Sequence, residues 1–283
     1  MPDHGLFGAG IVYDIAWAAE IHLIRVLGDT GVGDLLALTH ALSQLPALLL
    51  SGENAGKRLI VNLSLMLDIP PSEHLLSLWF PRTSASLPAL RRRWSDVCRT
   101  LTLLQSSIVE VIDWLGEQGA LVVAAAGNDN LGATVRPEPR LPARHESVLS
   151  VAAVDMTRQP AGFSNRGDAP GFGNGLAVLG GNAALAGGGG PPQISRGGDG
   201  QPDAVVGIFS ADELPLGAGK NETGWAYWVG TSFATPIISA IAARVWCVNP
   251  HLTPDEVKAA VHAFATSPEG ALDCSAVIAW QQT

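Results

Sequence analysis

The chain has 283 residues, of which 47% are hydrophobic and 15% charged, and it contains 32 glycines. This composition fits one large α/β domain with a substantial core and excludes a chain that is disordered throughout. Acidic residues outnumber basic ones by 26 to 17, and the resulting net charge of -9 argues against a nucleic-acid-binding surface.

Other broad classes find little support in the sequence. We expect no apolar run to reach the length of a membrane span, and the N-terminus lacks the charged-then-apolar pattern of a signal peptide. We therefore expect no membrane partner, and the sequence assigns no cellular compartment. The cysteines are too few and too scattered for a metal site or a disulfide framework, and the histidines lack metal-ligand spacing, so no metal or cofactor is expected.

Apolar strand-like runs alternate with helical patterns along the chain. The strand-like runs lie at 21–27, 59–65, 120–126, 148–154 and 204–209, and the helical patterns at 5–19, 32–50, 99–118, 232–247 and 254–265. Fully apolar strands between helices predict a mostly parallel sheet with helices on both faces, in a single domain over residues 1–283. Residues 68–98, rich in Pro, Ser and Arg, are predicted to be an insertion near the substrate groove, and residues 167–200 a long glycine-rich loop.

Three blocks of sequence contain candidate functional residues. Residues 3–12 place His4 at the start of a helix whose small residues allow a neighbouring element to approach closely. Residues 121–130 form a buried strand that ends in a polar turn at Asn128. Residues 229–239 form a hydroxyl-rich turn that enters an apolar helix, which places Ser232 where backbone N–H groups are unpaired. Taken alone, that third block is more typical of a helix simply capped by Thr231 or Ser232, and only together with the other two blocks does it favour a nucleophile.

In the order histidine, asparagine, serine, these blocks resemble the subtilisin-like serine proteases, or subtilases. The family's histidine block begins His-Gly and continues to Ala-Gly, its oxyanion asparagine closes an Ala-Ala-Gly-Asn strand, and its nucleophile lies in Gly-Thr-Ser-x-Ala-x-Pro. All three patterns are present here, and residues 14–27, 59–65, 148–155 and 163–167 resemble further family blocks in the same order. The resemblance implies a three-layer subtilisin-like fold and a serine endopeptidase acting on peptide or protein substrates.

The resemblance also implies roles for individual residues. Ser232 is expected to be the nucleophile, His4 the base and Asn128 the donor to the oxyanion. The substrate is expected to bind along Asn62, Leu63, Ser64, Leu65, Ala125 and Gly127. Structural calcium is common in the family, but no carboxylate cluster here matches such a site. Met66 stands where the family usually has glycine, a departure that affects the cleft.

One family block is absent from the sequence. The catalytic aspartate of the family ends a strand upstream of the histidine, whereas only Met1, Pro2 and Asp3 precede His4. Asp3 is adjacent to His4 and cannot readily reach the far ring nitrogen of an imidazole that points at Ser232. We therefore expect a subtilase domain without its first, Asp-bearing strand and with impaired activity, arising as a fragment, a mis-started reading frame or a shortened product.

Two alternatives remain beside the peptidase. A non-catalytic pseudoprotease that binds peptides without cutting them is favoured by the missing aspartate and by Met66. A nucleotide-binding α/β domain is disfavoured because no glycine fingerprint lies between a strand and a helix.

Overall fold

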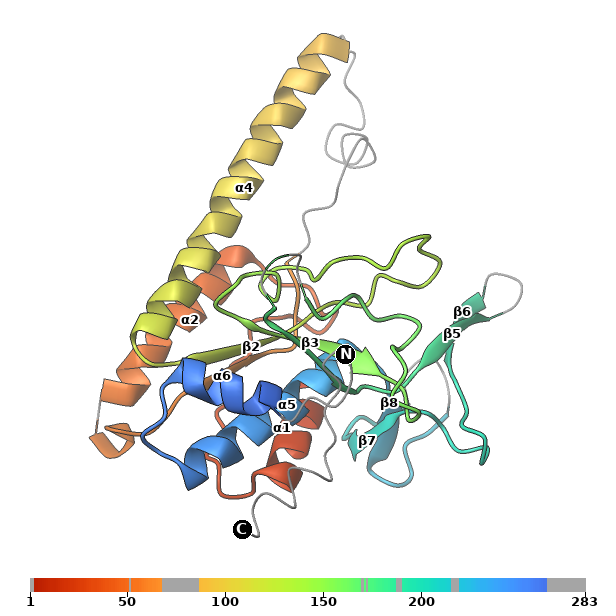
Figure 1. Cartoon of the computed structure of the whole chain (residues 1–283). Coiled ribbons are helices and arrows are strands. Elements are labelled where there is room, and N and C mark those ends of the chain that lie inside the picture. The colour runs from red at the N-terminus through yellow and green to blue at the C-terminus, as the bar shows by residue number, and fades with distance from the viewer. Residues whose placement is uncertain are drawn as a thin grey trace.

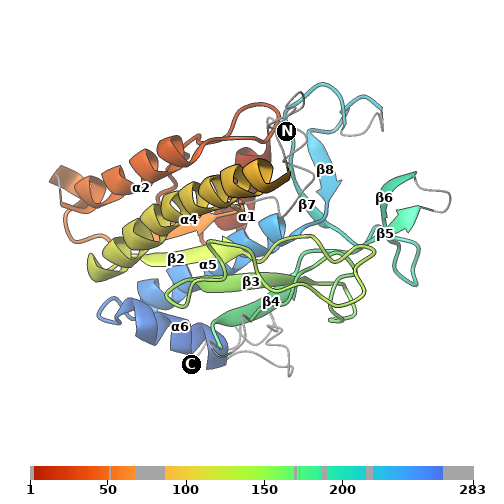
Figure 2. The same ribbon diagram turned by 90° about the horizontal axis from the view of Figure 1, so that it is seen from above.

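The computed structural model describes residues 3–50, 52–67, 87–168, 171, 173–186, 190–214 and 219–263. Among these residues, parallel strands pair in the order β1 (Ile60–Leu63), β2 (Leu121–Ala125), β3 (Leu149–Val154), β4 (Gly175–Leu179). Helices α2 (Leu35–Leu50) and α4 (Leu87–Glu117) lie on one side of this sheet, and α5 (Thr231–Val248) and α6 (Pro254–Ala263) on the other (Figure 2). Helix α1 (His4–Ile15) packs against α5. The expected α/β architecture is confirmed.

Both faces of the sheet are buried, as the apolar strands predict. Leu121 and Val123 of β2 enter the core beneath α5, while Val122 and Ala124 enter the core beneath α2 and α4. Every residue of β2 and β3 is buried, because successive side chains point to opposite faces and both faces are covered.

Helix α5 lies at the centre of the molecule and contacts β1, β2, β3 and β4. By length and composition this helix would pass as a membrane span, so the expectation that no apolar run reaches that length is wrong. Because 72% of α5 is buried within the protein, its apolar residues are accounted for by the core.

Residues 21–27 do not form the expected strand. Leu23 and Ile24 are 61% and 48% exposed, and the segment runs as an irregular stretch ahead of a turn closed by the Gly28 N–H and the Val32 carbonyl at 2.9 Å. An apolar run forms a strand only where a neighbour supplies backbone partners. Within the described part of the chain, no strand pairs with residues 21–27, and β1 is an edge strand of the sheet.

The expected strand at 204–209 exists but belongs to a different sheet. Strand β7 (Val205–Ile208) pairs antiparallel with β8 (Trp225–Trp228), away from the parallel sheet (Figure 1). Its residues alternate between buried and exposed, the pattern of an antiparallel ribbon with one face in solvent.

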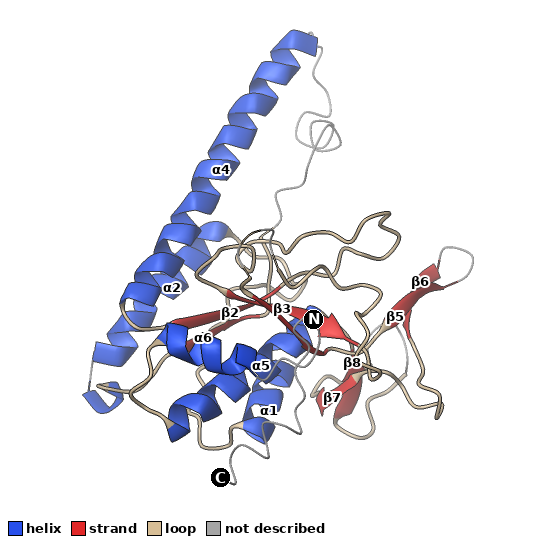
Figure 3. Ribbon diagram, in the orientation of Figure 1, coloured by secondary structure: helices blue, strands red, loops and turns tan. Residues whose placement is uncertain are grey.

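The expectations for two long irregular segments need correction. Residues 167–200 contain β4 and the antiparallel pair β5 (Ala183–Ala186) and β6 (Gly190–Ile194), because short runs of small apolar residues pair despite the glycine content. Helix α4 already begins at Leu87, so residues 87–98 are helical, and its first turns extend well beyond the sheet (Figure 3). The remainder of the expected insertion, 68–86, lies outside the described residues. A short 3₁₀ turn, η1 (Gly52–Asn54), follows α2.

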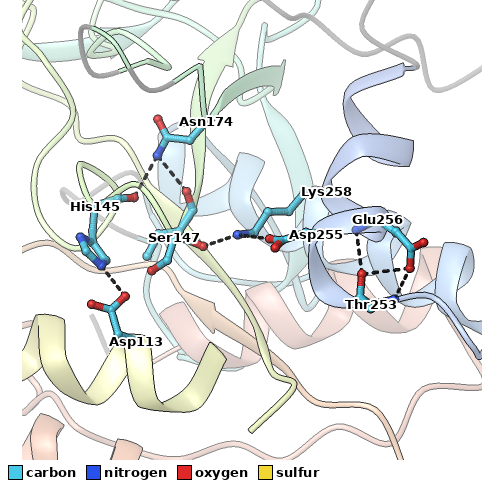
Figure 4. A network of polar contacts seen from close by, with 9 residues as sticks. Asp113, His145, Ser147, Asn174, Thr253, Asp255, Glu256 and Lys258 are labelled. Atoms are coloured by element: carbon cyan, nitrogen blue, oxygen red, sulfur yellow. Dashed lines mark hydrogen bonds and ion pairs between the residues drawn. The ribbon is translucent and has the colours of Figure 1, made fainter. Parts of the chain in front are cut away.

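A polar network joins α6 to the segment before β3 (Figure 4). Thr253 and Glu256 form a capping box, in which the Glu256 carboxylate accepts from the Thr253 N–H at 2.7 Å and the Glu256 N–H donates to the Thr253 hydroxyl at 3.3 Å. In the first half of the same helix, Lys258 donates to the Ser147 carbonyl at 2.5 Å. These contacts fix α6 against the base of the sheet.

Candidate active site

The end of β2 and the start of α5 are joined through Asn128 and Thr231. The Asn128 Oδ1 accepts from the Thr231 N–H at 3.0 Å and from the Thr231 hydroxyl at 3.1 Å. The same hydroxyl accepts from the Gly127 N–H at 3.2 Å. With Oδ1 occupied in this way, the other half of the Asn128 amide, its Nδ2, remains available as a donor beside the start of the helix.

Thr231 and Ser232 do not cap α5, so that alternative reading of the sequence is wrong. The N-cap residue is Gly230, and in the described structure no side-chain cap hydrogen bond is made at this end of the helix. Thr231 is fully buried and bonds across to the turn after β2 instead. The Ser232 N–H lies in the first turn of α5, where N–H groups lack partners within the helix.

Buried Asn165 holds the turn that carries Asn128. Its Oδ1 accepts from the Asp129 N–H at 2.8 Å, and its Nδ2 donates to the Ala126 carbonyl at 3.1 Å and to the Asp129 carboxylate at 2.8 Å. Gly127 has a φ of +111°, and a Cβ there would lie 2.6 Å from the Asn165 Nδ2, so only glycine fits. Hydrogen bonding from Arg140, at 2.9 Å, is the main cause that lowers the pKa of Asp129.

Ser232 is also tied to the segment after β1. The Ser64 hydroxyl donates to the Ser232 carbonyl at 2.7 Å, and the Ser232 hydroxyl points back to the Ser64 carbonyl at 3.4 Å. Asn62 continues this network, since its Nδ2 donates to the Ser64 hydroxyl at 3.0 Å and its Oδ1 accepts from Ser239 at 2.9 Å. The first half of α5 is therefore bound to β1 by side-chain hydrogen bonds.

His4 is the first residue of α1 and is partly buried. Burial is the main cause that lowers its pKa, with a smaller contribution from the positive amino terminus, so the ring is neutral near pH 7. Asp3 is buried, and its carboxylate accepts from the Ser210 N–H and the Ala211 N–H, both at 2.7 Å. The Asp3 carboxylate is therefore engaged by the residues after β7, and in the described structure it makes no hydrogen bond to the His4 ring.

One cavity of about 1560 Å³ unites the candidate residues. Its walls include all of the residues expected from the sequence to act in catalysis or substrate binding: His4, Asn62, Leu63, Ser64, Leu65, Ala125, Gly127, Asn128 and Ser232. The cavity continues along the edge of β1 toward residues 21–27, which also line it. No hydrogen bond joins His4 to Ser232 in the described structure, where the serine hydroxyl faces Ser64 instead.

The expected substrate-binding residues differ in which of their groups, side chain or backbone, are available to a ligand in the cavity. The Leu63 side chain is 6% exposed and lies in the core beneath α2 and α4, so it presents only its backbone to the cavity. The side chains of Asn62 and Ser64 are occupied by the hydrogen bonds to α5. Met66 is 44% exposed, and the next residue, Leu67, donates its N–H to the Leu141 carbonyl at 2.7 Å.

Sequence reasoning did not find the supporting roles of Thr231, Asn165 and Ser239. All three lie in blocks that were recognised, but the hydrogen bond from Thr231 spans 103 positions of sequence and is visible only in three dimensions. In the described residues, no three His, Cys, Asp or Glu side chains gather into a metal site.

Comparison with solved structures identifies the fold. A lanthipeptide protease matches with a TM-score of 0.64 at 16% identity, covering 98% of this chain and 75% of that one. A protease from Pseudoalteromonas arctica matches with a TM-score of 0.62 at 22% identity, covering 98% and 70%. The prenylagaramide maturation protease PagA matches with a TM-score of 0.60 at 21% identity, covering 99% and 82%. A cold-adapted subtilisin-like serine proteinase matches as well, with a TM-score of 0.55 at 19% identity. At these identities the likeness establishes the fold alone, which is the three-layer subtilisin-like fold.

Sequence comparison identifies the family. No curated protein matches the chain at a significant level. The sequence model of the subtilase family, however, matches residues 4–274, nearly the whole chain. The matched region begins at the candidate base His4 and includes the Asn128 turn and the start of α5. The chain therefore belongs to the subtilase family of serine peptidases, whose substrates are peptides or proteins.

Proposed function

We propose that this subtilase is a serine endopeptidase in which Ser232 attacks the peptide carbonyl, His4 takes and returns the proton, and Asn128 donates to the oxyanion. The observation that carries the proposal is the anchored amide of Asn128. Thr231 occupies its Oδ1 at 3.0 Å, which leaves the Nδ2 as a fixed donor next to the start of α5. A fixed donor stabilises negative charge without reorganising during the reaction.

The chemistry follows from where the groups lie. Attack by the Ser232 oxygen converts the carbonyl oxygen of the substrate into an oxyanion. The Asn128 Nδ2 and the Ser232 N–H are the two donors proposed to receive it, and the positive end of the α5 dipole adds to their effect. Neutral His4 accepts the proton from Ser232 and passes it to the leaving amine as the carbon–nitrogen bond breaks, which leaves Ser232 acylated. Water, deprotonated by His4, then attacks this ester, and His4 returns the proton to the Ser232 oxygen as the acid product leaves.

We propose that substrate binding uses backbone groups along Asn62, Leu63, Ser64 and Leu65, together with Ala125 and Gly127. The Leu63 side chain is buried and the Ser64 hydroxyl is engaged by Ser232, which leaves the main chain to pair with an extended peptide. Met66 lies at the end of this segment and narrows the space there relative to glycine.

We further propose that the activity of this chain is impaired. Among the described residues no carboxylate hydrogen-bonds to the His4 ring, and Asp3 is held by Ser210 and Ala211. In subtilisin itself, loss of the orienting aspartate lowers kcat by roughly ten-thousandfold but leaves a measurable rate. A slow hydrolase is therefore expected.

A peptide-binding protein that does not cleave is the second candidate. It is favoured by the orientation of the Ser232 hydroxyl, which faces the Ser64 carbonyl at 3.4 Å. In both candidates the cavity binds peptide, and only the first needs a reactive Ser232.

A fluorophosphonate probe tests the first candidate directly. We expect slow formation of one adduct, located by mass spectrometry on the peptide that contains Ser232. Labelling should vanish in Ser232→Ala and persist in Ser106→Ala, which alters an exposed serine of α4. Labelling that survives Ser232→Ala would disprove the nucleophile assignment, and peptide binding with no labelling at all would favour the non-catalytic candidate.

A further inference from the structure

The His4 ring lies against two aromatic side chains. Its centroid is 5.1 Å from that of Phe233, with an interplanar angle of 48°, and 6.1 Å from that of Trp228, with an angle of 76°. Trp228 and Phe233 stack on each other at 5.0 Å and 28°. Among the described residues, no hydrogen bond holds the His4 ring, so its orientation rests on packing.

Two further rings fix this aromatic pair. Phe7, one turn after His4 on α1, lies 4.8 Å from Phe233 and 5.6 Å from Trp228, and Phe209 lies 5.7 Å from Trp228. Four rings, here termed the aromatic clamp, surround this position: Phe7 of α1, Phe209 directly after β7, Trp228 of β8 and Phe233 of α5. They therefore hold three separate parts of the fold in one arrangement around His4.

The backbone is shaped to admit the clamp. A Cβ on Gly207 of β7 would lie 2.7 Å from atoms of the Phe7 ring, so glycine at that position allows Phe7 to lie against the strand. The Asp3 carboxylate, bonded to the Ser210 N–H at 2.7 Å and the Ser210 hydroxyl at 2.9 Å, secures the start of α1 to the same ribbon. The main chain at His4 is thus fixed on both sides.

We infer that Trp228 and Phe233 are positioning residues, which hold the His4 ring at the wall of the cavity that Ser232 also lines. In a Ser–His–Asp triad a hydrogen-bonded carboxylate fixes the imidazole. Here ring packing performs the orienting part of that task, but, unlike a carboxylate, it supplies no negative charge to pair with the imidazolium. The inference rests on the proposed function, because it takes His4 to be the base.

The aromatic clamp also accounts for the lowered pKa of His4. Aromatic walls remove water from the ring, and burial is the main cause of its lowered pKa. The amino terminus contributes a smaller lowering effect, and among the described residues the adjacent Asp3 carboxylate is bonded to Ser210 and Ala211. Opening the aromatic wall should therefore raise the pKa of His4 toward the ordinary value of about 6.5.

The test uses the full chain with isotope-labelled histidine and follows two readouts. The first is the NMR titration of the His4 ring, assigned with His4→Gln, and the second is the rate at which a fluorophosphonate labels Ser232. Trp228→Leu should raise the His4 pKa and slow labelling by roughly tenfold, the factor that corresponds to loss of one well-made aromatic contact. Trp228→Phe keeps a ring at the same position, so its His4 pKa and its rate of Ser232 labelling should stay close to those of the wild type.

Two variants serve as a control and as a safeguard. Trp225→Leu alters the same strand at a residue that is 51% exposed, and should behave as the wild type. Phe233→Met removes a ring with little loss of volume, so it replaces Trp228→Leu if that variant fails to fold. The inference is overturned if folded Trp228→Leu or Phe233→Met leaves the titration and the labelling rate unchanged. A wild type with unlabelled Ser232 would instead overturn the proposed function, and the ring titration would still decide the role of the clamp.

Discussion

The amide of Asn128 has two ends, and the structure gives them separate tasks. Its Oδ1 accepts two hydrogen bonds from Thr231, which fixes the side chain, while its Nδ2 is left for a ligand. A substitution that keeps the oxygen and removes the nitrogen therefore separates structure from catalysis. Asn128→Asp is such a change, because a carboxylate oxygen still accepts from Thr231.

We expect Asn128→Asp and Asn128→Ala both to slow fluorophosphonate labelling of Ser232 by roughly a hundredfold to a thousandfold, the cost known from removing one oxyanion donor in subtilisin. Asn128→Asp should retain more of the wild-type stability toward urea than Asn128→Ala, because Asp keeps the acceptor for Thr231. Labelling at the wild-type rate in both variants would show that Asn128 only shapes the turn.

Asn165 is a second residue whose side chain fixes a longer segment, the turn that follows β2. It is fully buried and bonds to the main chain at Ala126 and Asp129, on either side of Gly127. We expect Asn165→Ala to lower the free energy of unfolding by about 2–4 kcal/mol, because several buried groups lose their partners. The control is Asn130→Ala, which removes one partly buried hydrogen bond, at 2.9 Å to the Gly162 carbonyl, and should cost less. Equal urea midpoints for the two variants would contradict this role.

At the scale of single elements, α1 and α6 each carry a partly buried histidine. Burial is the main cause that lowers the pKa of His4 and of His262; for His262 the Asp168 carboxylate opposes the effect and Lys258 adds to it. The unfolded chain takes up protons on both rings near pH 6.5, whereas the native chain does so only at lower pH. The free energy of unfolding therefore keeps its full value above about pH 6.5 and decreases as the pH falls toward the pKa values of the native chain.

This argument predicts the pH dependence of unfolding in urea. The free energy of unfolding should be nearly constant from about pH 8 to pH 7 and should fall below about pH 6.5. His262→Gln removes one of the two groups and should make that fall shallower. A fall of the same steepness in His262→Gln would mean that other groups, such as Asp129 at still lower pH, dominate the acid response.

At the scale of the whole molecule, the sequence predicts what is periodic or local. Each of the five helical patterns corresponds to a helix, and the runs at 59–65, 120–126 and 148–154 contain β1, β2 and β3. Residues 21–27 have the same apolar character as these runs, but strand formation depends on a partner that no local pattern reveals. Likewise, Val205–Ile208 is a strand by composition, and only the pairing with Trp225–Trp228 decides its sheet.

The residues of the candidate site also fall into those that a local sequence pattern predicts and those that only the folded structure reveals. His4 begins α1, Asn128 follows β2 closely and Ser232 lies in the first turn of α5, each in a recognisable sequence pattern, and all of them line one cavity. The groups that hold them were not predictable, because their partners lie far away in sequence: Ser64 bonds to Ser232 across 168 positions. Such contacts depend on the packed arrangement of the sheet and α5 rather than on any short motif.

The central place of α5 has a consequence for how the protein opens. Helix α5 contacts every strand of the parallel sheet, so we expect its amide groups to exchange with solvent mainly through unfolding of the whole domain. Ser232 lies in the first turn of that helix and Trp246, which is 3% exposed, near its end. Reactivity of Ser232 toward the probe and fluorescence of buried tryptophan should therefore disappear at the same urea concentration. Loss of reactivity well before the fluorescence change would instead show that the first turn of α5 opens on its own.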